Sequence, residues 1–498
     1  MFPWWTFEGV KLAFFRPVTV LTHRLDHALW PDKPALMHAH SLLWLGAMVA
    51  AAAVAYRRIL GHGLAAGLAA LAYAIDDGHA FPAAWVANRN AMVATTFGLL
   101  ALIAHDRWRR DRWVPGAALG PALLALGLCS AEAAIAAFAL LLAHATFLDA
   151  ATPARRAIAI LPHLAVVVVW RLVHGALGYG AYGSGYYVDP LASPVAFARA
   201  VAERAPVLLL GQWALAPTDV HVFLPETART VLWIVGACVV ALLAWLLGGL
   251  VRRDRVARFF AASMLLCVVP ACATFPMERL LLFAGFGAMG LFAMLLAHLP
   301  VRPAARRLAV GLAVVHLAVA PILLPIRTLS PLLFAPIARN LASVPDDPNF
   351  HELDIVAVRA PDPYSTGFIP LRRALDGRAL PAHVRRLASS GTALTVRRLD
   401  ARTLHLRPEG GFLSEPDAML VRDREHPMRR GDRVVLTGLT IEIVASTPDH
   451  RPAEVTFRFD RPLEDPGIRW LAMGADGFVP WTPPQVGRTV RLPAHPLL

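Results

Sequence analysis

The chain has 498 residues, and 57% of them are hydrophobic. Its mean hydropathy is +0.52 and its formal net charge is +13. This composition excludes an ordinary soluble enzyme and favours an integral membrane protein. Nucleic acid binding is not indicated either, because residues 340–498 carry 21 basic and 20 acidic side chains and nearly all of the excess charge belongs to the apolar half.

Residues 1–37 form the first region, which begins with tryptophans. Leu21, Leu25 and Leu29 recur at helical spacing beside polar side chains, which predicts an amphipathic helix on the membrane surface, ended by prolines 31 and 34. We interpret this region as the remnant of a first outer loop. The charge pattern described below places it outside the cytosol, so we expect a further helix upstream of residue 1.

Residues 38–326 form a predicted bundle of about ten membrane spans, each close to the ~20 apolar residues that cross a bilayer. A long outer loop at about 178–228 interrupts the bundle. The predicted spans are 38–57, 64–79, 91–104, 116–130, 132–149, 157–177, 229–250, 256–273, 279–298 and 306–325.

Arginine clusters mark every second connection between these spans. Retention of positive charge in the cytosol assigns that face to the cytosol and the opposite face to the outside. The arginine-heavy composition suggests a bacterial chain, so we expect a multi-pass protein of the bacterial inner membrane. The clusters include residues 57–58, 107–112, 155–156, 252–258 and 302–307.

Residues 340–498 are expected to form a mostly β, sandwich-like domain outside the cytosol that folds alone from about residue 345. The segment 453–460 alternates, with Val455, Phe457 and Phe459 on one face. The segment 434–444 holds two strand-like runs interrupted by Gly438, which predicts a hairpin. The predicted fold class is therefore a mainly α membrane bundle followed by a β domain.

Ionisable residues gather at the outer ends of three short connections, where charges beside membrane spans are costly and therefore candidates for function. Carboxylates beside arginines suit a reaction that uses a carboxylate base and a phosphate-bearing substrate. The alternative is that they are interfacial ion pairs and helix caps. The residues concerned are Asp76, Asp77, His79, Arg89, Glu132, Glu278 and Arg279.

Four segments over residues 14–290 resemble, in order and spacing, the GT-C glycosyltransferases, particularly the branch with the tetratricopeptide-bearing protein O-mannosyltransferases. FRPVT at 15–19, followed by LD and ALW, is similar to "YRPLT…LDYALW", and WVANRN at 85–90 to "WISGRKD". CSAE at 129–132 stands where that branch has "LSKE", and ERLLLFAGFG at 278–287 resembles "ERYLYLPSVG".

The resemblance implies transfer of a sugar from a polyprenyl-phosphate carrier to a glycan, lipid or protein acceptor outside the cytosol. The family's "HPVHTE" position is DDGHAF at 76–81, and its usual catalytic aspartate would lie in the part of the first loop that precedes this chain. We therefore expect Asp76, Asp77 and Glu132 as catalytic groups, and as substrate or lipid-phosphate binders Arg16, His79, Arg89, Glu278 and Arg279.

Other classes stay open at this point. One is a non-catalytic membrane anchor that presents the β domain to a partner or glycan, and another is a transporter, although the charges gather at one face rather than at mid-membrane. The four cysteines lie in or beside predicted spans, so neither disulfides nor a cysteine zinc site is expected. No metal ligand set is predicted, and dependence on a divalent metal is left open.

Overall fold

The computed structural model describes residues 2–416 and 418–495, which divide into two compact units. Unit 1 contains the residues up to Lys11, Tyr182–Tyr186 and the residues from Leu332 onward. Unit 2 contains Leu12–Ala181 and Tyr187–Pro331. Each unit is described by itself below.

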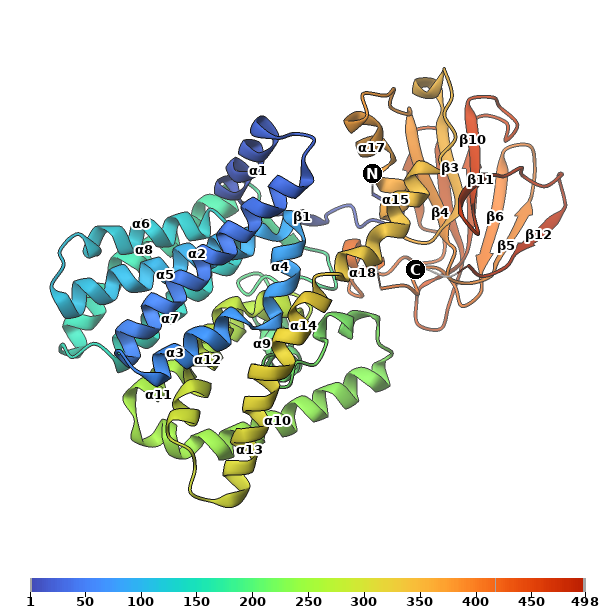
Figure 1. The fold of residues 1–498 in the computed structure, drawn as a ribbon. Helices are drawn as coiled ribbons and strands as arrows, with labels where there is room; N and C mark the ends of the chain where they lie inside the picture. The colour runs from blue at the N-terminus through green and yellow to red at the C-terminus, as the bar shows by residue number, and fades with distance from the viewer. Residues whose placement is uncertain (1, 417, 496–498) are drawn as a thin grey trace. The chain divides into compact units, whose positions relative to one another are not determined.

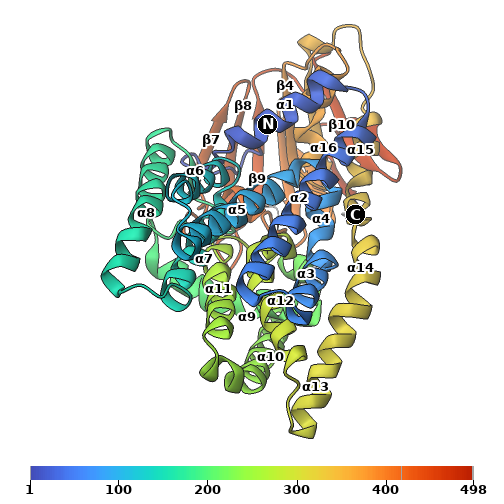
Figure 2. The ribbon, with the colours of Figure 1, turned by 60° about the vertical axis from the view of Figure 1, so that its left-hand side comes forward.

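Unit 2 is a bundle of α-helices (Figure 1). A π-helical turn at Val315–Val319 joins α13 to α14, and the two run on as one rod (Figure 2). The helices are α1 Pro17–Leu29, α2 Pro34–Leu60, α3 Leu64–Ala74, α4 Ala80–Ala84, α5 Arg89–Asp111, α6 Gly116–Leu128, α7 Ile135–Phe147, α8 Pro153–Ala176, α9 Pro194–Ala214, α10 Glu226–Arg253, α11 Arg255–Ala271, α12 Leu282–Ala297, α13 Pro303–Val314 and α14 Ala320–Arg327.

Five helical segments among the described residues are long and apolar enough to cross a membrane, which supports a multi-pass membrane protein. The prediction of about ten spans also included shorter apolar stretches. In the structure these stretches are helices of 10–17 residues each. The five long segments are Pro34–Leu60, Val86–Asp111, Pro153–Ala176, Glu226–Arg253 and Pro303–Ala342, and the shorter ones are Leu64–Ala74, Gly116–Leu128, Glu132–Phe147 and Leu282–Ala297.

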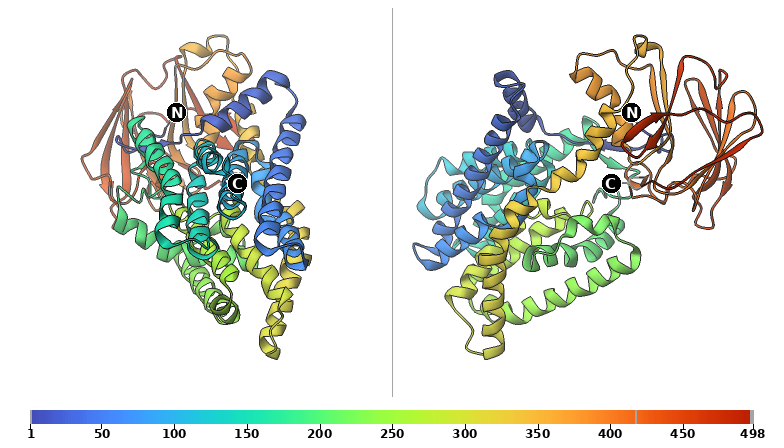
Figure 3. Two further views of the ribbon diagram at one scale, coloured as in Figure 1. Left: turned by 90° about the vertical axis from the view of Figure 1, so that its left-hand side faces the viewer. Right: turned by 45° about the vertical axis from the view of Figure 1, so that its right-hand side comes forward.

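The segment 178–228, expected as a long outer loop, contains the 21-residue helix α9. Its C-terminal half is buried from Val207 to Trp213, and α9 lies beside α10, as the green helices in the right panel of Figure 3 show. Arginines and a glutamate in its first half dilute the apolar pattern, so hydropathy alone did not mark it as a helix of the bundle.

Unit 1 contains two sheets with a shared core. The larger is antiparallel, with strand order β12-β5-β6-β9-β8-β7, and the smaller has the order β11-β10-β3-β4. The strands are β3 Asp354–Ala360, β4 His383–Ser389, β5 Leu394–Arg398, β6 Thr403–Pro408, β7 Arg433–Leu436, β8 Leu439–Ser446, β9 Pro452–Phe459, β10 Ile468–Gly474, β11 Gly477–Pro480 and β12 Thr489–Leu492; the two further strands β1 Lys11–Ala13 and β2 Gly180–Tyr182 pair with each other.

Two local predictions for this unit are confirmed. Strand β9 buries Val455, Phe457 and Phe459 as the alternating pattern predicts. Strands β7 and β8 form the expected antiparallel hairpin, and Gly438 at its turn has a φ of +74°, a conformation that favours glycine.

The smaller sheet departs from the expected sandwich. Strands β10, β3 and β4 are parallel, and β3 is buried along its whole length. The short helices α16 Tyr364–Gly367 and α17 Ile369–Leu375 connect β3 to β4, as parallel strands require. With α15 Ala335–Ala342 and α18 Ala418–Val421, they give unit 1 a helical component that the strand-length runs did not indicate.

The first residues of the chain belong to the core of unit 1. Trp4 and Trp5 are 6% and 3% exposed, and the indole nitrogen of Trp4 donates to the carbonyl of Leu387 at 3.0 Å. Arg422 donates to the carbonyls of Trp5 and Thr6. A fragment starting near residue 345 would lack both tryptophans, so we now expect it to be unstable on its own.

Unit 1 also constrains how often the chain crosses a membrane. Its three segments fold together, so they lie on one side. Each of the two stretches between them must therefore cross an even number of times. Which side this is remains the prediction made from the arginine pattern.

Candidate functional site

The turn after α3 begins with two adjacent aspartates. Asp76 caps the short 3₁₀ helix Asp77–His79, because its Oδ1 accepts from the Gly78 amide at 2.9 Å. Its Oδ2 accepts from the Gln212 side chain of α9 at 2.8 Å. A Cβ on Gly285 of α12 would lie 3.1 Å from the Gln212 Oε1, so glycine there lets α12 approach this pair closely.

Arg327, in the last turn of α14, joins this turn to a second carboxylate. Its Nη1 lies 2.7 Å from the Asp77 Oδ2 and also bonds to Glu278, which opens the 3₁₀ helix Glu278–Leu280 before α12. Its Nη2 donates to the Leu215 carbonyl at 2.7 Å. The guanidinium of Arg327 therefore pairs with two carboxylates, one from the turn after α3 and one from the turn before α12.

A fourth carboxyl group comes from the 3₁₀ helix Thr218–Phe223. The Oδ1 of Asp219 accepts from the Glu278 amide at 3.0 Å, and the Thr218 amide donates to the Glu278 Oε1 at 3.3 Å. We call the four carboxylates the acidic cluster; its members are Asp76, Asp77, Asp219 and Glu278.

Burial raises three of the four pKa values. Burial and then the charge of Asp76 raise the pKa of Asp77 to about 6, against the opposing charge of Arg327. Burial raises the pKa of Glu278 to about 8, although Arg327 acts in the other direction. The pKa of Asp219 is raised by burial as well. Near neutral pH, Glu278 thus holds a proton while Asp77 has mostly lost its own.

Arg327 therefore contacts both a protonated carboxyl group, Glu278, and an ionised one, Asp77. Such a pair, with pKa values on either side of neutrality, is suited to proton transfer. Arg327 is the most exposed of the three, with 19% of its side chain exposed against 3% for Asp77 and 9% for Glu278. A ligand would therefore meet the guanidinium first.

Two other predicted site residues lie beside these elements. His79 is 2% exposed, its ring centroid is 4.7 Å from that of Tyr73, and burial lowers its pKa, so it is neutral near pH 7. The Arg279 guanidinium carbon lies 5.7 Å from the centroid of the Phe81 ring, and its charge acts on Asp219.

Arg89 is placed elsewhere. It is fully buried and pairs with Asp26 of α1, with 2.6 Å between Nη1 and Oδ2. It also donates to the Met37 carbonyl at 2.7 Å and to Ser41 at 3.0 Å. The Asp26 Oδ1 lies 2.5 Å from the His40 Nδ1. With these partners Arg89 fixes α1 against α2, and in this arrangement its guanidinium is not open to a phosphate.

Glu132 and Arg16 form a third group. The Arg16 Nε donates to the Glu132 Oε2 at 2.9 Å, and the Phe15 amide donates to its Oε1 at 2.7 Å. Both side chains stay partly exposed, at 33% and 25%. Among the described residues, no hydrogen bond or ion pair joins Glu132 to the acidic cluster.

The structure therefore brings together Asp76, Asp77 and Glu278, with His79 nearby, and leaves Arg89 and the Arg16–Glu132 pair in other environments. Sequence reasoning missed Arg327, Gln212 and Asp219. Arg327 could have been found as an isolated cation directly after an apolar stretch of membrane length, and Gln212 as a polar residue in the apolar run of α9.

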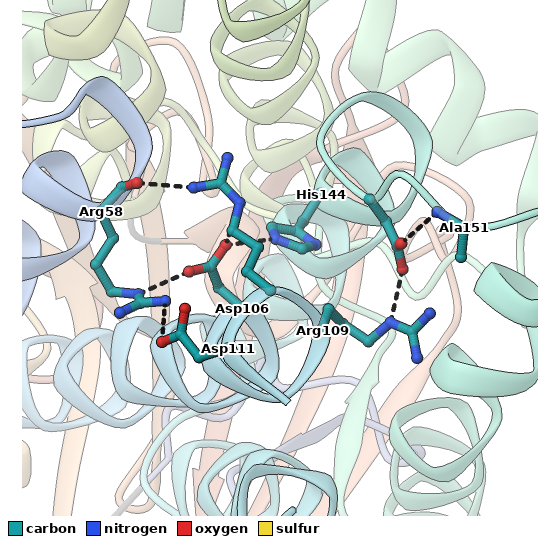
Figure 4. Close-up of polar contacts among 8 residues, drawn as sticks. Arg58, Asp106, Arg109, Asp111, His144 and Ala151 are labelled. Carbon is teal, nitrogen blue, oxygen red and sulfur yellow. Dashed lines mark hydrogen bonds and ion pairs between the residues drawn. The ribbon is translucent and has the colours of Figure 1, made fainter. Parts of the chain in front are cut away.

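A second polar network lies at the arginine-rich end of unit 2 (Figure 4). Asp106 of α5 accepts from Arg58 at 2.6 Å and from His144 at 2.9 Å, and Arg110 lies 3.2 Å from it. Arg58 also donates to Asp111, and Arg109 donates to Asp149 at 2.7 Å. We call these residues the arginine-face network, in which three guanidinium groups meet three carboxylates.

Within the described part of the chain, no group of three or more His, Cys, Asp or Glu side chains has the geometry to hold a metal ion. Comparison of the sequence with protein family models and with curated proteins, and of the fold with solved structures, finds no match.

Proposed function

We propose that this chain is a membrane glycosyltransferase that moves a sugar from a polyprenyl-phosphate carrier to an acceptor at the membrane face of the acidic cluster. The observation that carries the proposal is the Asp77–Arg327–Glu278 bridge, which unites a base, an acid and a cation at the ends of apolar helices. The motif resemblance over residues 14–290 points to the same chemistry.

In this proposal Asp77 acts as the general base. It removes the proton of the acceptor hydroxyl while the acceptor oxygen attacks the anomeric carbon of the sugar. The bond from that carbon to the phosphate oxygen breaks, and the polyprenyl phosphate leaves with the electron pair. Arg327 and Arg279 bind the departing phosphate, because guanidinium groups match the geometry of phosphate oxygens.

Glu278 keeps its proton in this step. A neutral Glu278 limits repulsion between the donor phosphate and the acidic cluster. Turnover should therefore need Asp77 ionised and Glu278 protonated. The pH dependence should be bell-shaped, with limbs near the pKa values of about 6 and about 8.

The test measures lipid-linked sugar consumption by membranes that carry the full chain, with a panel of polyprenyl-phosphate sugars. Asp77→Asn should lower turnover about 100-fold or more, since general-base catalysis typically contributes that much. Asp111→Asn, the same exchange at a carboxylate that is 48% exposed, should retain turnover.

Equal turnover by parent and Asp77→Asn would remove Asp77 as the base. No turnover by the parent with any donor would contradict the proposal and favour a non-catalytic anchor, in which the bundle presents unit 1 to a protein or glycan partner. Repeating the assay with and without a chelator settles the dependence on a divalent metal.

A further inference from the structure

A groove at the arginine-rich end of unit 2 lies between α2 and α3, away from the acidic cluster. It encloses about 270 Å³, close to the lower limit of ~300 Å³ for small-molecule pockets. Its lining residues are Ala53, Arg57, His62, Gly63, Ala66, Gly67 and Ala70.

The floor of the groove is formed by small residues of α3 and its N-cap. Gly63 and Gly67 are exposed, and a Cβ on either would meet no atom within 4 Å. Ala66 between them is buried at 2% exposure and packs into the bundle. The result is an open groove with a mostly apolar lining along the exposed side of α3, one of the shorter apolar helices.

The mouth of the groove carries an uncompensated positive charge. Arg57 stands in the last turn of α2 and donates from Nη2 to the His62 Nε2 at 3.1 Å. No carboxylate pairs with Arg57 among the described residues, whereas its neighbour Arg58 bonds to both Asp106 and Asp111. The two adjacent arginines therefore have different environments.

We propose that this groove binds an anionic phospholipid of the leaflet on the arginine-rich face. One acyl chain lies along the small residues of α3, and the headgroup phosphate accepts from Arg57 and from the Nδ1–H of His62. Charge complementarity favours this occupant: a cation at the end of a membrane-length helix sits at headgroup level, directly above an apolar channel. The proposal is independent of the proposed transferase activity.

The experiment titrates the detergent-purified full chain with dioleoyl phosphatidylglycerol or dioleoyl phosphatidylcholine and follows bound lipid by native mass spectrometry. Arg57→Gln should weaken phosphatidylglycerol binding about fivefold, as loss of one basic residue near anionic lipid predicts, with little change for phosphatidylcholine. Arg253→Gln, which removes an exposed charge from the end of α10, should leave the strongest bound lipid unchanged.

Gly67→Leu places an apolar side chain in the groove, at a position whose Cβ would meet no atom within 4 Å, and should abolish the tightest lipid-bound state. Gly46→Leu is its matched control, because Gly46 is an exposed glycine of α2 whose Cβ would also meet no atom within 4 Å but does not line the groove. Both exchanges favour helix, so folding should persist.

Lipid preference that is unchanged in Arg57→Gln and Gly67→Leu would overturn the proposal. A loss of dimers in Gly67→Leu without a change in lipid binding would overturn it too, and would assign the Gly63-x-x-x-Gly67 face to a second copy of the chain.

Discussion

The acidic cluster and the arginine-face network involve residues on either side of α3 in the chain, and they balance charge in opposite ways. Three carboxylates meet three guanidinium groups in the arginine-face network. In the acidic cluster four carboxyl groups face Arg327 and Arg279, so that among the described residues the acids are in excess. Helix α3 itself is about 16 Å long, and it joins Arg58 at the end of α2 to Asp76 and Asp77.

The difference is visible in the pKa values of groups outside the membrane-spanning helices. Burial opposes ionisation of Asp149, but hydrogen bonds from Arg109 and the Ala151 amide outweigh it, and the pKa of Asp149 is lowered. At Glu278 burial prevails over Arg327 and the pKa is raised to about 8. Balanced charges thus stay ionised and tie helices together, whereas a surplus of acids leaves a proton available near neutral pH.

The largest effect should come from removing Arg327, the guanidinium that bonds to both Asp77 and Glu278. Arg327→Gln should lower the free energy of unfolding by about 3 kcal/mol at pH 8, because the buried Asp77 carboxylate and the ionised fraction of Glu278 lose their counter-ion. The loss should shrink at pH 5, where both can be protonated. Thermal unfolding followed by tryptophan fluorescence at the two pH values measures it, with Arg302→Gln at an exposed helix start as control. If Arg327→Gln lowered the free energy of unfolding equally at pH 5 and pH 8, the interpretation that the acidic cluster has more acids than bases would be wrong.

A smaller loss is expected at the arginine-face network. Asp106→Asn should cost about 2 kcal/mol, since Arg58 and Arg110 lose their common acceptor but remain partly exposed to water. The two arginines do not titrate between pH 5 and 8, so their share of this loss should be the same at both values, and any change with pH comes from His144, the third partner of Asp106. Asp111→Asn, which removes a more exposed partner of Arg58, should have little effect. A strong pH dependence in Asp106→Asn that persists when His144 is also replaced by Gln would contradict the contrast between the two regions.

The smallest effect has the opposite sign. Glu278→Gln should raise the free energy of unfolding by roughly 1 kcal/mol above pH 8, because the neutral amide avoids ionisation of a buried carboxyl whose pKa is raised from 4.5 to about 8. Stability of the parent falls as pH rises between these two values, so the advantage should grow across that window and then level off. Glu226→Gln, at an exposed helix start, should show no such trend. Destabilisation by Glu278→Gln at pH 9 would show that Glu278 acts as a paired ion.

Patterns within one element were sufficient for much of the fold. The helix at 17–29, strand β9 and the β7–β8 hairpin follow from apolar spacing and from Gly438, because each depends on neighbours within about ten residues. The parallel sheet of unit 1 was not predictable in the same way. Its strands are buried on both faces and so lack an alternating pattern, as β3 shows.

The candidate site was partly predictable for the same reason. Asp76, Asp77 and Glu278 were selected because charges that end apolar spans at one membrane level are expected to meet. Arg89 follows the same sequence rule, yet it is buried against Asp26, because α1 folds back over α2 and provides a nearer carboxylate. The contribution of Arg327 depends on where α14 ends in space, which no local pattern specifies.

The contact between Trp4 and Leu387 has a consequence for synthesis of the protein. Trp4 and Leu387 are 383 residues apart in the sequence. At ~5–20 residues per second, the ribosome therefore adds Leu387 about 20–80 s after Trp4. Throughout that interval two tryptophans have no core to enter. The segment must therefore wait outside the core, and the larger sheet of the β domain is complete only after β12, Thr489–Leu492, has been made.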